Sequence, residues 1–330
     1  LNCTARIAGD GKERKVDVWA GNQAPTIVQW LAAGVADAAV DNVTVHTPYL
    51  GGGFGRRFDL EVIRQALECA KVTGGKPVQL IWSREDDIRH DAYRPAVAAR
   101  MTAVLDDAGQ VAAWQQQMVG PSVSKSVIGR MNPMFAGDYP PDLTNAEGAM
   151  HLPYALPNFR CDHAQVNLPV ATGYWRSVGN SYNAFFVETF IDELAVALKK
   201  DPYLFRLELL KDQPRFANVL SAAASAVDCG TALHPENVKA QIASAAIFGL
   251  TAALKGKITL SEGVVQQSNF NDYPLLSMAE CPQFETIIID SGAPLGGIGE
   301  VGTPPVAPAL GNAIFAATGK RLRGLPFGLG

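Results

Sequence analysis

The first eighty residues show two patterns of hydrophobic and polar positions, one with the period of a strand and one with the period of a helix. Period-two segments at 1–6 and 16–20 flank a turn sequence of glycine and aspartate, which predicts a β-hairpin. A short β-branched run at 43–47 predicts a third strand. Apolar residues at helical spacing predict a helix over 60–72, and a strand is expected at 78–82. This order predicts a strand–helix–strand unit.

The middle of the chain is less periodic. Residues 97–120 predict a hairpin around a polar turn, whereas residues 121–160 are rich in proline and glycine and predict a long ordered loop. Asn183 is a candidate N-cap for a helix whose apolar residues recur at helical spacing. Asp201 followed by Pro202 marks the start of a second helix. We therefore expect two consecutive helices after the loop.

The last third of the chain predicts further strands and one more helix. Strand-like runs cover 264–270 and 285–289, and a helix is expected over 303–319. We expect an α+β fold with mixed sheets in two subdomains, which comprise residues 1–222 and 223–330.

The composition excludes several classes of protein. Of the 330 residues, 48% are hydrophobic, which is enough for a sizeable core. The formal net charge of −4 argues against nucleic acid or an anionic membrane surface as the main partner. Five dispersed cysteines and five histidines lack the spacing of metal ligands, so no side-chain metal site is predicted. The uncharged stretch 301–319 contains three prolines and is expected to be a buried helix.

A glycine-rich segment at 51–57, with the sequence Gly-Gly-Gly-Phe-Gly-Arg-Arg, lies between a predicted strand and a predicted helix. Backbone N–H groups that converge at a helix N-terminus can hold an anion, so this loop is a candidate cofactor-binding site. Its spacing does not match the dinucleotide fingerprint GxGxxG. A tight turn that needs positive φ explains the glycines equally well. A nucleotide-binding protein is a further alternative that rests on this loop alone.

Glu300 stands in a second glycine-rich segment, 296–302, just before the predicted helix 303–319. A carboxylate among glycines and apolar residues is costly unless it is paired or used, so Glu300 is a candidate general base. A glutamate that caps the helix is the alternative.

Arg176 and Gln241 are two further candidates for binding residues. Arg176 lies between aromatic residues and glycine, where an arginine can hold a phosphate or a carboxylate through two hydrogen bonds. A stacked structural arginine is the alternative. Gln241 could donate to a cofactor oxygen, and a solvated amide is the alternative reading of that residue.

Seven segments in this order resemble the molybdopterin-binding large subunit of the xanthine oxidase family of molybdenum hydroxylases. Within that family the resemblance is to isoquinoline 1-oxidoreductase β subunits and membrane-associated bacterial aldehyde dehydrogenases. It extends over nearly the whole chain. The segments that carry it are 51–57, 82–88, 152–158, 174–179, 183–194, 227–230 and 296–317.

The resemblance implies an enzyme, a molybdopterin-dependent oxidoreductase in which Glu300 is the catalytic base. In such an enzyme Glu300 would deprotonate a molybdenum-bound hydroxyl, and water would supply the oxygen atom that enters an aldehyde or an N-heteroaromatic ring. The implied cofactor-binding residues are Gly52, Gly53, Phe54, Gly55, Arg176, Gln241 and Gly299. The implied substrate pocket is lined partly by Phe54, Trp175 and Val178.

The chain departs from the family pattern at three places. Phe58 stands where purine-oxidising members have an acidic residue, and Val178 stands where they have a stacking aromatic residue, so xanthine is a poor substrate candidate. After Gln241, residues 243–245 are Ala-Ser-Ala, where the family usually has Glu-Gly-Gly.

The implied cofactor is molybdopterin, in its simple or its cytosine dinucleotide form, with the metal held by the pterin dithiolene and by no side chain. The chain has no cysteine cluster for a 2Fe-2S centre, so electrons are expected to pass to a separate 2Fe-2S small subunit, with a cytochrome c subunit as a further partner. We also expect a small-molecule substrate, no nucleic acid and no membrane span. The expected location is the bacterial periplasm, with the cytoplasm as the alternative.

Compared with the family pattern, the chain lacks the segment before Leu1 and a long stretch around 221–226. These differences predict an incomplete form of the fold. The alternative to an enzyme is therefore a truncated or degenerate scaffold subunit of the same fold without catalytic activity.

Overall fold

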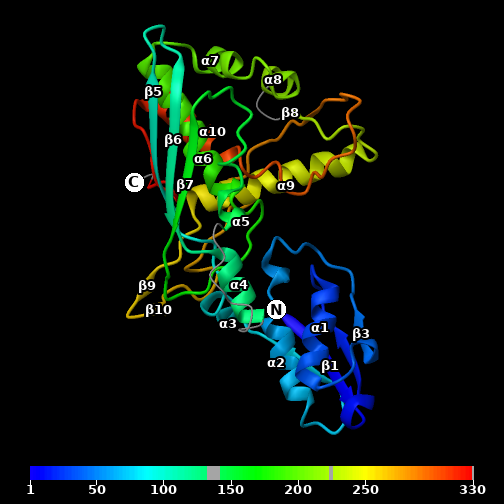
Figure 1. The fold of residues 1–330 in the computed structure, drawn as a ribbon. Helices are drawn as coiled ribbons and strands as arrows, with labels where there is room; N and C mark the ends of the chain where they lie inside the picture. Colours follow the sequence, from blue (N-terminus) through cyan, green and yellow to red (C-terminus); the bar gives the residue numbers. More distant parts are fainter. Residues whose placement is uncertain (132–141, 223–225, 329–330) are drawn as a thin grey trace.

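A computed structural model describes residues 1–131, 142–222 and 226–328 (Figure 1). Its N-terminal part is a mixed four-stranded sheet in the order β3-β2-β1-β4. The strands are β1 (Asn2–Ala8), β2 (Lys15–Trp19), β3 (Val43–His46) and β4 (Val78–Ile81). β1 and β2 form the predicted antiparallel hairpin, and β3 runs parallel to β2.

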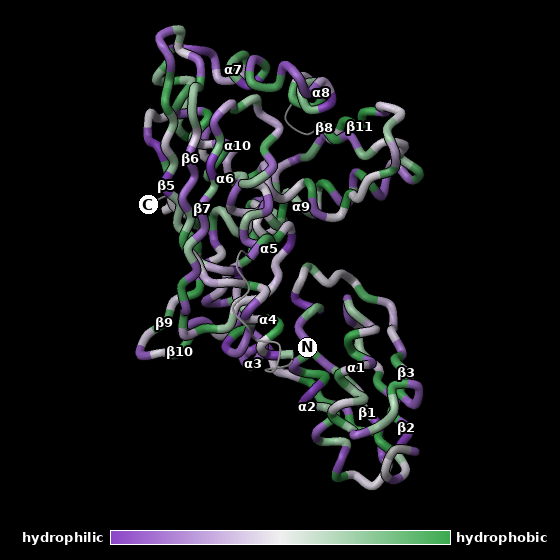
Figure 2. The backbone as a smooth tube through the Cα atoms, in the orientation of Figure 1, coloured by the Kyte–Doolittle hydropathy of each residue, from purple (hydrophilic) through white to green (hydrophobic). Residues whose placement is uncertain are grey.

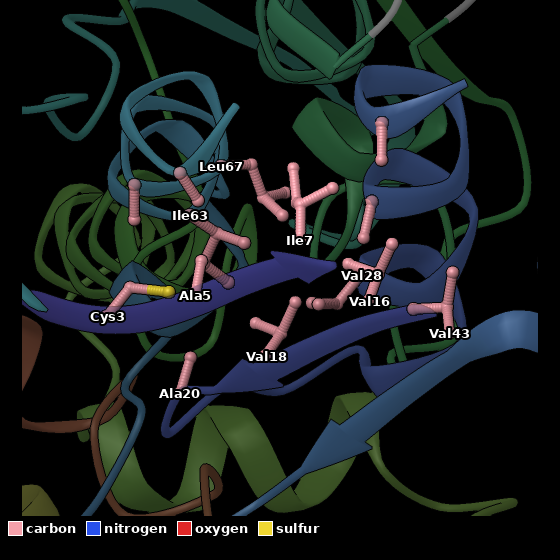
Figure 3. Packing of buried hydrophobic residues seen from close by; sticks show 14 of the residues in the cluster. Cys3, Ala5, Ile7, Val16, Val18, Ala20, Val28, Val43, Ile63 and Leu67 are labelled. Atoms are coloured by element: carbon pink, nitrogen blue, oxygen red, sulfur yellow. The ribbon is translucent and has the colours of Figure 1, made fainter. Parts of the chain in front are cut away.

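Two helices, α1 (Pro25–Ala36) and α2 (Glu61–Ala70), pack against this sheet. Alternate residues of β1 point toward the helices and are buried, as the period-two pattern requires (Figure 3). The strand–helix–strand unit is present as β3–α2–β4, but β2 and β1 lie between its two strands. α1 carries no pattern from which it was predicted. The labelled core side chains are Cys3, Ala5, Ile7, Val16, Val18, Ala20, Val28, Val43, Ile63 and Leu67.

A second mixed sheet has the order β5-β6-β7. β5 (Ala98–Leu105) and β6 (Val111–Gly120) form the predicted hairpin, and β7 (Phe159–Gln165) runs parallel to β6. A long helix, α6 (Asn180–Ala197), packs against this sheet, and α7 (Pro202–Leu209) joins the same core. As predicted, Asp201 caps α7 by accepting hydrogen bonds from the backbone at 203 and 204.

The prediction of a loop over 121–160 is wrong in part, because the structure has two helices there. They are α4 (Val123–Met131) and α5 (Leu143–Ala146), and residues 132–141 lie outside the described part. Ser122 Oγ accepts a hydrogen bond from the backbone of Lys125 (3.0 Å), which satisfies a donor at the start of α4. The buried residues of α4 are only Val123 and Val127, so its hydrophobic pattern was too short to detect.

The prediction that Asn183 caps α6 is also wrong. α6 begins at Asn180 after Gly179, and Asn183 lies fully buried inside the first turn of the helix. Short polar residues are favoured at caps, but a buried one inside a helix must find hydrogen-bond partners elsewhere in the fold.

The last third consists mainly of two helices, α9 (Pro235–Leu254) and α10 (Val306–Thr318), which pack on each other and with α6. Gly319 ends α10 in the left-handed conformation, as predicted, although the helix begins three residues later than expected. A shorter helix, α8 (Pro214–Ser221), precedes them.

The strands of this part are shorter than predicted. They pair as two small sheets, one parallel, between β8 (Ala226–Val227) and β11 (Ile287–Ile288), and one antiparallel, between β9 (Leu260–Ser261) and β10 (Val264–Val265). The mixed sheets and segregated helices agree with the predicted α+β class. The division into subdomains 1–222 and 223–330 stays a prediction.

By length and composition alone, α9 could cross a membrane, and Figure 2 shows apolar residues along it. Helices in the core of a folded domain have the same composition. In the structure α9 packs against α10 and carries two residues, Gln241 and Phe248, toward the glycine loop and the arginine motif.

Candidate functional site

The glycine loop, residues 51–55, is fixed by contacts with two other segments. Gln23, just before α1, accepts a hydrogen bond at Oε1 from the backbone N of Gly55 (3.1 Å). Gly55 has a φ of 88°, and a Cβ atom added there would lie 2.4 Å from the carbonyl oxygen of Tyr174. Position 55 thus requires glycine both for its backbone conformation and for this close approach. The loop thereby docks directly on the motif that contains Arg176.

The arginine motif, residues 174–179, contains two strained backbone positions. Ser177 has a φ of 71° and Val178 a φ of 41°, and this region is unfavourable for a β-branched residue such as valine. The backbone N of Val178 donates to the carbonyl oxygen of Trp175 (2.7 Å), which closes a tight turn before α6. The turn buries Arg176 and directs the backbone N of Ser177 at another segment.

Arg176 joins three segments that lie far apart in the sequence. Its Nε donates to the carbonyl oxygen of Gly299 (2.7 Å), its Nη1 to Ser244 Oγ (3.1 Å) and its Nη2 to Gln241 Oε1 (3.3 Å). The side chain is almost fully buried. Burial lowers the pKa of the guanidinium, and the nearby charge of Glu300 opposes that shift. Arg176 therefore fixes α9 and the second glycine segment relative to the arginine motif.

Glu300 is held by the strained turn. Its Oε1 accepts a hydrogen bond from the backbone N of Ser177 (3.2 Å), and its main-chain oxygen accepts one from Ser177 Oγ (2.7 Å). The Glu300 side chain is exposed in the described part of the chain. One carboxylate oxygen is thus oriented, and among the described residues no donor reaches the other.

Three aromatic rings pack beside Arg176, and we call Phe54, Trp175 and Phe248 the aromatic cluster. The ring of Phe248 lies 5.3 Å from that of Phe54 and 4.7 Å from that of Trp175, measured between centroids. The Arg176 guanidinium lies 5.6 Å from the centroid of Phe54, within the range of a cation–π contact. Phe54 is 41% exposed, so the cluster presents an aromatic face next to the glycine loop.

A second carboxylate stands close to Glu300. The turn at 142–148 docks on the start of α6, where Asn183 Nδ2 donates to the carbonyl oxygens of Asn145 (2.9 Å) and Glu147 (2.8 Å). Burial raises the pKa of the Glu147 carboxyl, and the negative charge of Glu300 raises it further. The buried amide of Asn183, misread as a cap in the sequence, therefore positions Glu147.

The structure gathers most of the sequence-predicted residues around Arg176. They are Phe54, Gly55, Trp175, Gln241, Gly299 and Glu300. Gly52 and Gly53 lie in the same loop, but a Cβ at Gly53 would meet the side chain of Gln23 instead of the cluster. Val178 shapes the turn through its positive φ, and its place in a substrate pocket stays a prediction. A cavity of about 430 Å³ lies elsewhere, between 150–159 and Phe216.

Sequence reasoning missed several residues of the site. Phe248 follows Gln241 by seven residues on α9, so the two share a helix face, and that spacing could have found it. Gln23, Ser177 and Glu147 carry no comparable local signal, because each reaches the site through a contact between distant segments.

The chemistry of the site suits a polar cofactor bound by backbone and side-chain hydrogen bonds. At Gly297 and Gly299 an added Cβ would meet nothing within 4 Å, so this backbone is open beside Arg176. The side chains of Gln241 and Ser244 are exposed on the same side of α9. Among residues 1–131, 142–222 and 226–328, no group of three or more histidine, cysteine, aspartate or glutamate side chains is placed to ligate a metal.

Comparison with known proteins identifies the family to which this chain belongs. Two family models described as molybdopterin cofactor-binding domain match residues 2–209 and 217–282. The chain therefore belongs to the molybdopterin cofactor-binding domain family, and the expected family and cofactor class are confirmed. Glu300 lies beyond both matched ranges, so its role depends on the motif and on the contacts described above.

Individual relatives narrow the comparison. The chain is 31% identical to isoquinoline 1-oxidoreductase subunit beta of Brevundimonas diminuta over 94% of its length and 46% of the relative. It is 28% identical to the membrane-bound aldehyde dehydrogenase of Gluconacetobacter polyoxogenes, with 96% and 50% coverage. Quinoline 2-oxidoreductase from Pseudomonas putida 86 has the same fold, with a TM-score of 0.78, 11% identity and coverage of 98% and 72%. The chain thus spans about half the length of the two curated relatives.

Proposed function

We propose that this protein is the catalytic subunit of a molybdopterin-dependent oxidoreductase that oxidises an aldehyde or hydroxylates an N-heteroaromatic ring. The observation that carries the proposal is the contact between the strained turn and Glu300. Ser177 N donates to Glu300 Oε1 while Arg176, next to it, binds the carbonyl oxygen of Gly299. A glutamate with only a structural role would not need a serine at positive φ to orient one of its carboxylate oxygens.

In this proposal Glu300 acts as the general base. Its oriented carboxylate takes a proton from the water-derived oxygen that attacks the substrate carbon. Ser177 restricts the carboxylate to one orientation, which leaves its other oxygen free to accept that proton. The aromatic cluster offers an apolar face against which a planar substrate can stack.

The cofactor would be held by this chain's backbone and by three polar side chains. When bound, molybdopterin supplies the two-electron oxidation that the side chains cannot perform. Gly297 and Gly299 present open backbone, and Gln241 and Ser244 present exposed donors beside Arg176. Ser244, within the Ala-Ser-Ala sequence that departs from the family, accepts a hydrogen bond from Arg176, so this departure leaves the site connected.

The test is the substitution Glu300→Gln in protein produced with its cofactor and its electron-accepting partner. Removal of a general base is expected to lower kcat by about 10²–10⁴-fold. Molybdenum and pterin content should stay close to wild type, because the glutamine keeps a hydrogen-bond acceptor for Ser177. Glu285→Gln is the matched control, since Glu285 is an exposed carboxylate in the same third of the chain.

Two outcomes would contradict the proposal. Turnover that survives Glu300→Gln would remove the base role, and loss of the cofactor in that variant would make the residue structural. Wild-type protein without molybdenum after cofactor-competent production would favour a scaffold subunit of the same fold without catalytic activity.

The relative from Brevundimonas diminuta is named as a β subunit, which supports a separate partner chain that accepts the electrons. We propose a 2Fe-2S small subunit as that partner, with a cytochrome c subunit beyond it, in the bacterial periplasm. Copurification of an iron-sulfur protein with the chain, detected by its visible absorbance and by iron analysis, would support this arrangement. A catalytically competent chain purified alone that passes electrons directly to an outer acceptor such as dioxygen would contradict it.

A further inference from the structure

Arg94 lies beside the arginine motif, in a position fixed by the backbone. Tyr93 pairs with Thr172 in a parallel bridge, in which the N of Tyr93 donates to Ala171 O (2.9 Å) and Tyr93 O accepts from Gly173 N (3.0 Å). This pairing runs directly into the arginine motif. The side chain of Arg94 therefore starts from an ordered backbone next to the candidate site.

The Arg94 guanidinium packs on the face of Trp175, with its central carbon 4.8 Å from the ring centroid. Trp175 belongs to the aromatic cluster, so Arg94 extends the row of rings that begins at Phe54. The phenols of Tyr182 and Tyr273 lie near enough to act on its charge. The hydroxyl of Tyr182 donates to the carbonyl oxygen of Asn145, in the turn that carries Glu147.

Arg94 differs in its partners from two other partly buried arginines in the first half of the chain, Arg56 and Arg130. Arg56 forms ion pairs with Asp87 and Asp91, and Arg130 forms one with Asp59. Among the residues that the structure describes, no carboxylate pairs with Arg94 and no acceptor takes a hydrogen bond from it. Burial lowers the pKa of its guanidinium. A cation placed in this way is costly unless an anion offsets the loss of water.

The shape of the group indicates which anion would bind. The Arg94 guanidinium lies over the Trp175 ring. A guanidinium that packs on an aromatic ring through its flat face keeps the N–H donors at its edge for other partners. Carboxylate and phosphate oxygens match that fork through two parallel hydrogen bonds.

We propose that Arg94, supported by Trp175, forms an oxyanion-binding subsite at the edge of the aromatic cluster. A carboxylate on a planar substrate and a phosphate of the cofactor share the required chemistry. The first would make this chain selective for aromatic acids, and the second would make Arg94 a cofactor residue. Only the functional meaning of the subsite rests on the proposed activity, because anion binding itself needs no turnover.

The experiment titrates the purified chain with benzoate and, separately, with inorganic phosphate, at constant ionic strength set with chloride. Binding is followed by calorimetry and by the difference in tryptophan fluorescence between the wild type and Trp175→Phe. We expect Arg94→Gln to raise the Kd of the bound anion by about 10–100-fold, because the variant loses hydrogen bonds to a charged group. Arg94→Lys should give an intermediate Kd, because it keeps the charge and loses the fork.

Arg100→Gln is the matched control, because Arg100 is an exposed arginine on β5. Binding of benzoate with no competition from phosphate assigns the subsite to a carboxylate, and preferential binding of phosphate assigns it to the cofactor. Equal losses in Arg94→Gln and Arg100→Gln, or no binding of either anion to the wild type, would overturn the proposal. Arg94→Lys, checked for folding by circular dichroism, gives the answer if Arg94→Gln does not fold. Neither result changes the test of Glu300, which is read from turnover.

Discussion

The glycine loop 51–55 and the glycine segment 296–299 both end beside Arg176, but their surroundings differ. At Gly55 the φ is positive and an added Cβ would collide with a backbone carbonyl. At Gly297 and Gly299 the backbone is in an ordinary conformation and an added Cβ would meet nothing within 4 Å. The glycine at position 55 is therefore required by this chain's own folding. Nothing within the described structure requires glycine at 297 or 299, so a requirement there would come from a bound molecule.

The two segments are also held by different kinds of contact. The loop 51–55 packs against Gln23 and Tyr174, which makes it rigid before any ligand binds. The segment 296–299 is attached at Gly299 through Arg176 and at Gly296 through a backbone bond to Cys229 (2.9 Å). One half of the site is thus preorganised by packing, and the other by a few hydrogen bonds.

The largest effect is expected from Arg176, where the two segments meet. Arg176→Ala removes four hydrogen bonds, to Gly299, Ser244 and Gln241, and leaves a space where a nearly fully buried side chain stood. We expect the free energy of unfolding to fall by about 3–5 kcal/mol, measured by urea denaturation. Arg176→Lys should recover less than half of this loss, because one ammonium group cannot reach acceptors in three directions. Full recovery with lysine would show that only the charge matters.

A smaller effect is expected from a direct test of the two kinds of glycine. Gly55→Ala should lower the free energy of unfolding by about 2–4 kcal/mol, through the collision with Tyr174 and the unfavourable φ. Gly299→Ala should change it by less than about 0.5 kcal/mol. If a cofactor packs on the open backbone, Gly299→Ala should nevertheless reduce the molybdenum content of the purified protein. Equal destabilisation by the two variants would remove the distinction between the segments.

The smallest effect concerns the pH dependence of stability near the second segment. Burial and the charge of Glu300 raise the pKa of Glu147 above its usual 4.5 in the folded state. The folded state therefore binds the Glu147 proton more tightly than the unfolded state does. The stability that this proton contributes is fully present below pH 4.5 and is lost as pH rises through the pKa of the folded state.

The charges of Glu300 and Asp142 both raise the pKa of Glu147, and Glu300→Gln removes the first of them. We therefore expect the pKa of Glu147 to fall in this variant, as measured by carboxyl carbon NMR. In Glu147→Gln the slope of stability against pH just above 4.5 should flatten. Asp86→Gln is a control at an exposed carboxylate of α3 (Arg84–Arg89) and should leave the Glu147 resonance unchanged. A Glu147 pKa that ignores Glu300→Gln would show that the two carboxylates are not coupled.

Local signals in the sequence were enough for the elements that end or begin at a distinctive residue. Asp201-Pro202 marked the start of α7 and Gly319 the end of α10, because capping and left-handed termination depend on neighbouring residues alone. The segments 1–6 and 16–20 likewise predicted the hairpin of β1 and β2. α1 and α4 were missed, and Asn183 was misassigned, because asparagine is favoured at helix caps and its tertiary partners cannot be seen in the sequence.

Residues of the candidate site were predictable only where a short segment of sequence forms a recognisable motif. The glycine loop, the arginine motif and Glu300 each stand out locally. Arg94, Glu147 and Phe248 belong to the same region because of contacts across 81 to 194 positions, and no pattern of adjacent residues encodes such a contact. Buried polar residues such as Asn183 are the hardest to interpret, because their partners are backbone carbonyls that every residue carries.

The four hydrogen bonds of Arg176 also determine when the site can form during synthesis. Its acceptors lie 65 to 123 positions further along the chain, so a nascent polypeptide that has emerged only as far as α6 carries this arginine without them. Closing so long a connection is slow compared with forming the helix beside it. The N–H donors of Arg176 therefore lack these acceptors until the segment around Gly299 has been made and folded. A ribosome-bound chain stopped before that point should expose Arg176 to chemical modification, and the released chain should protect it.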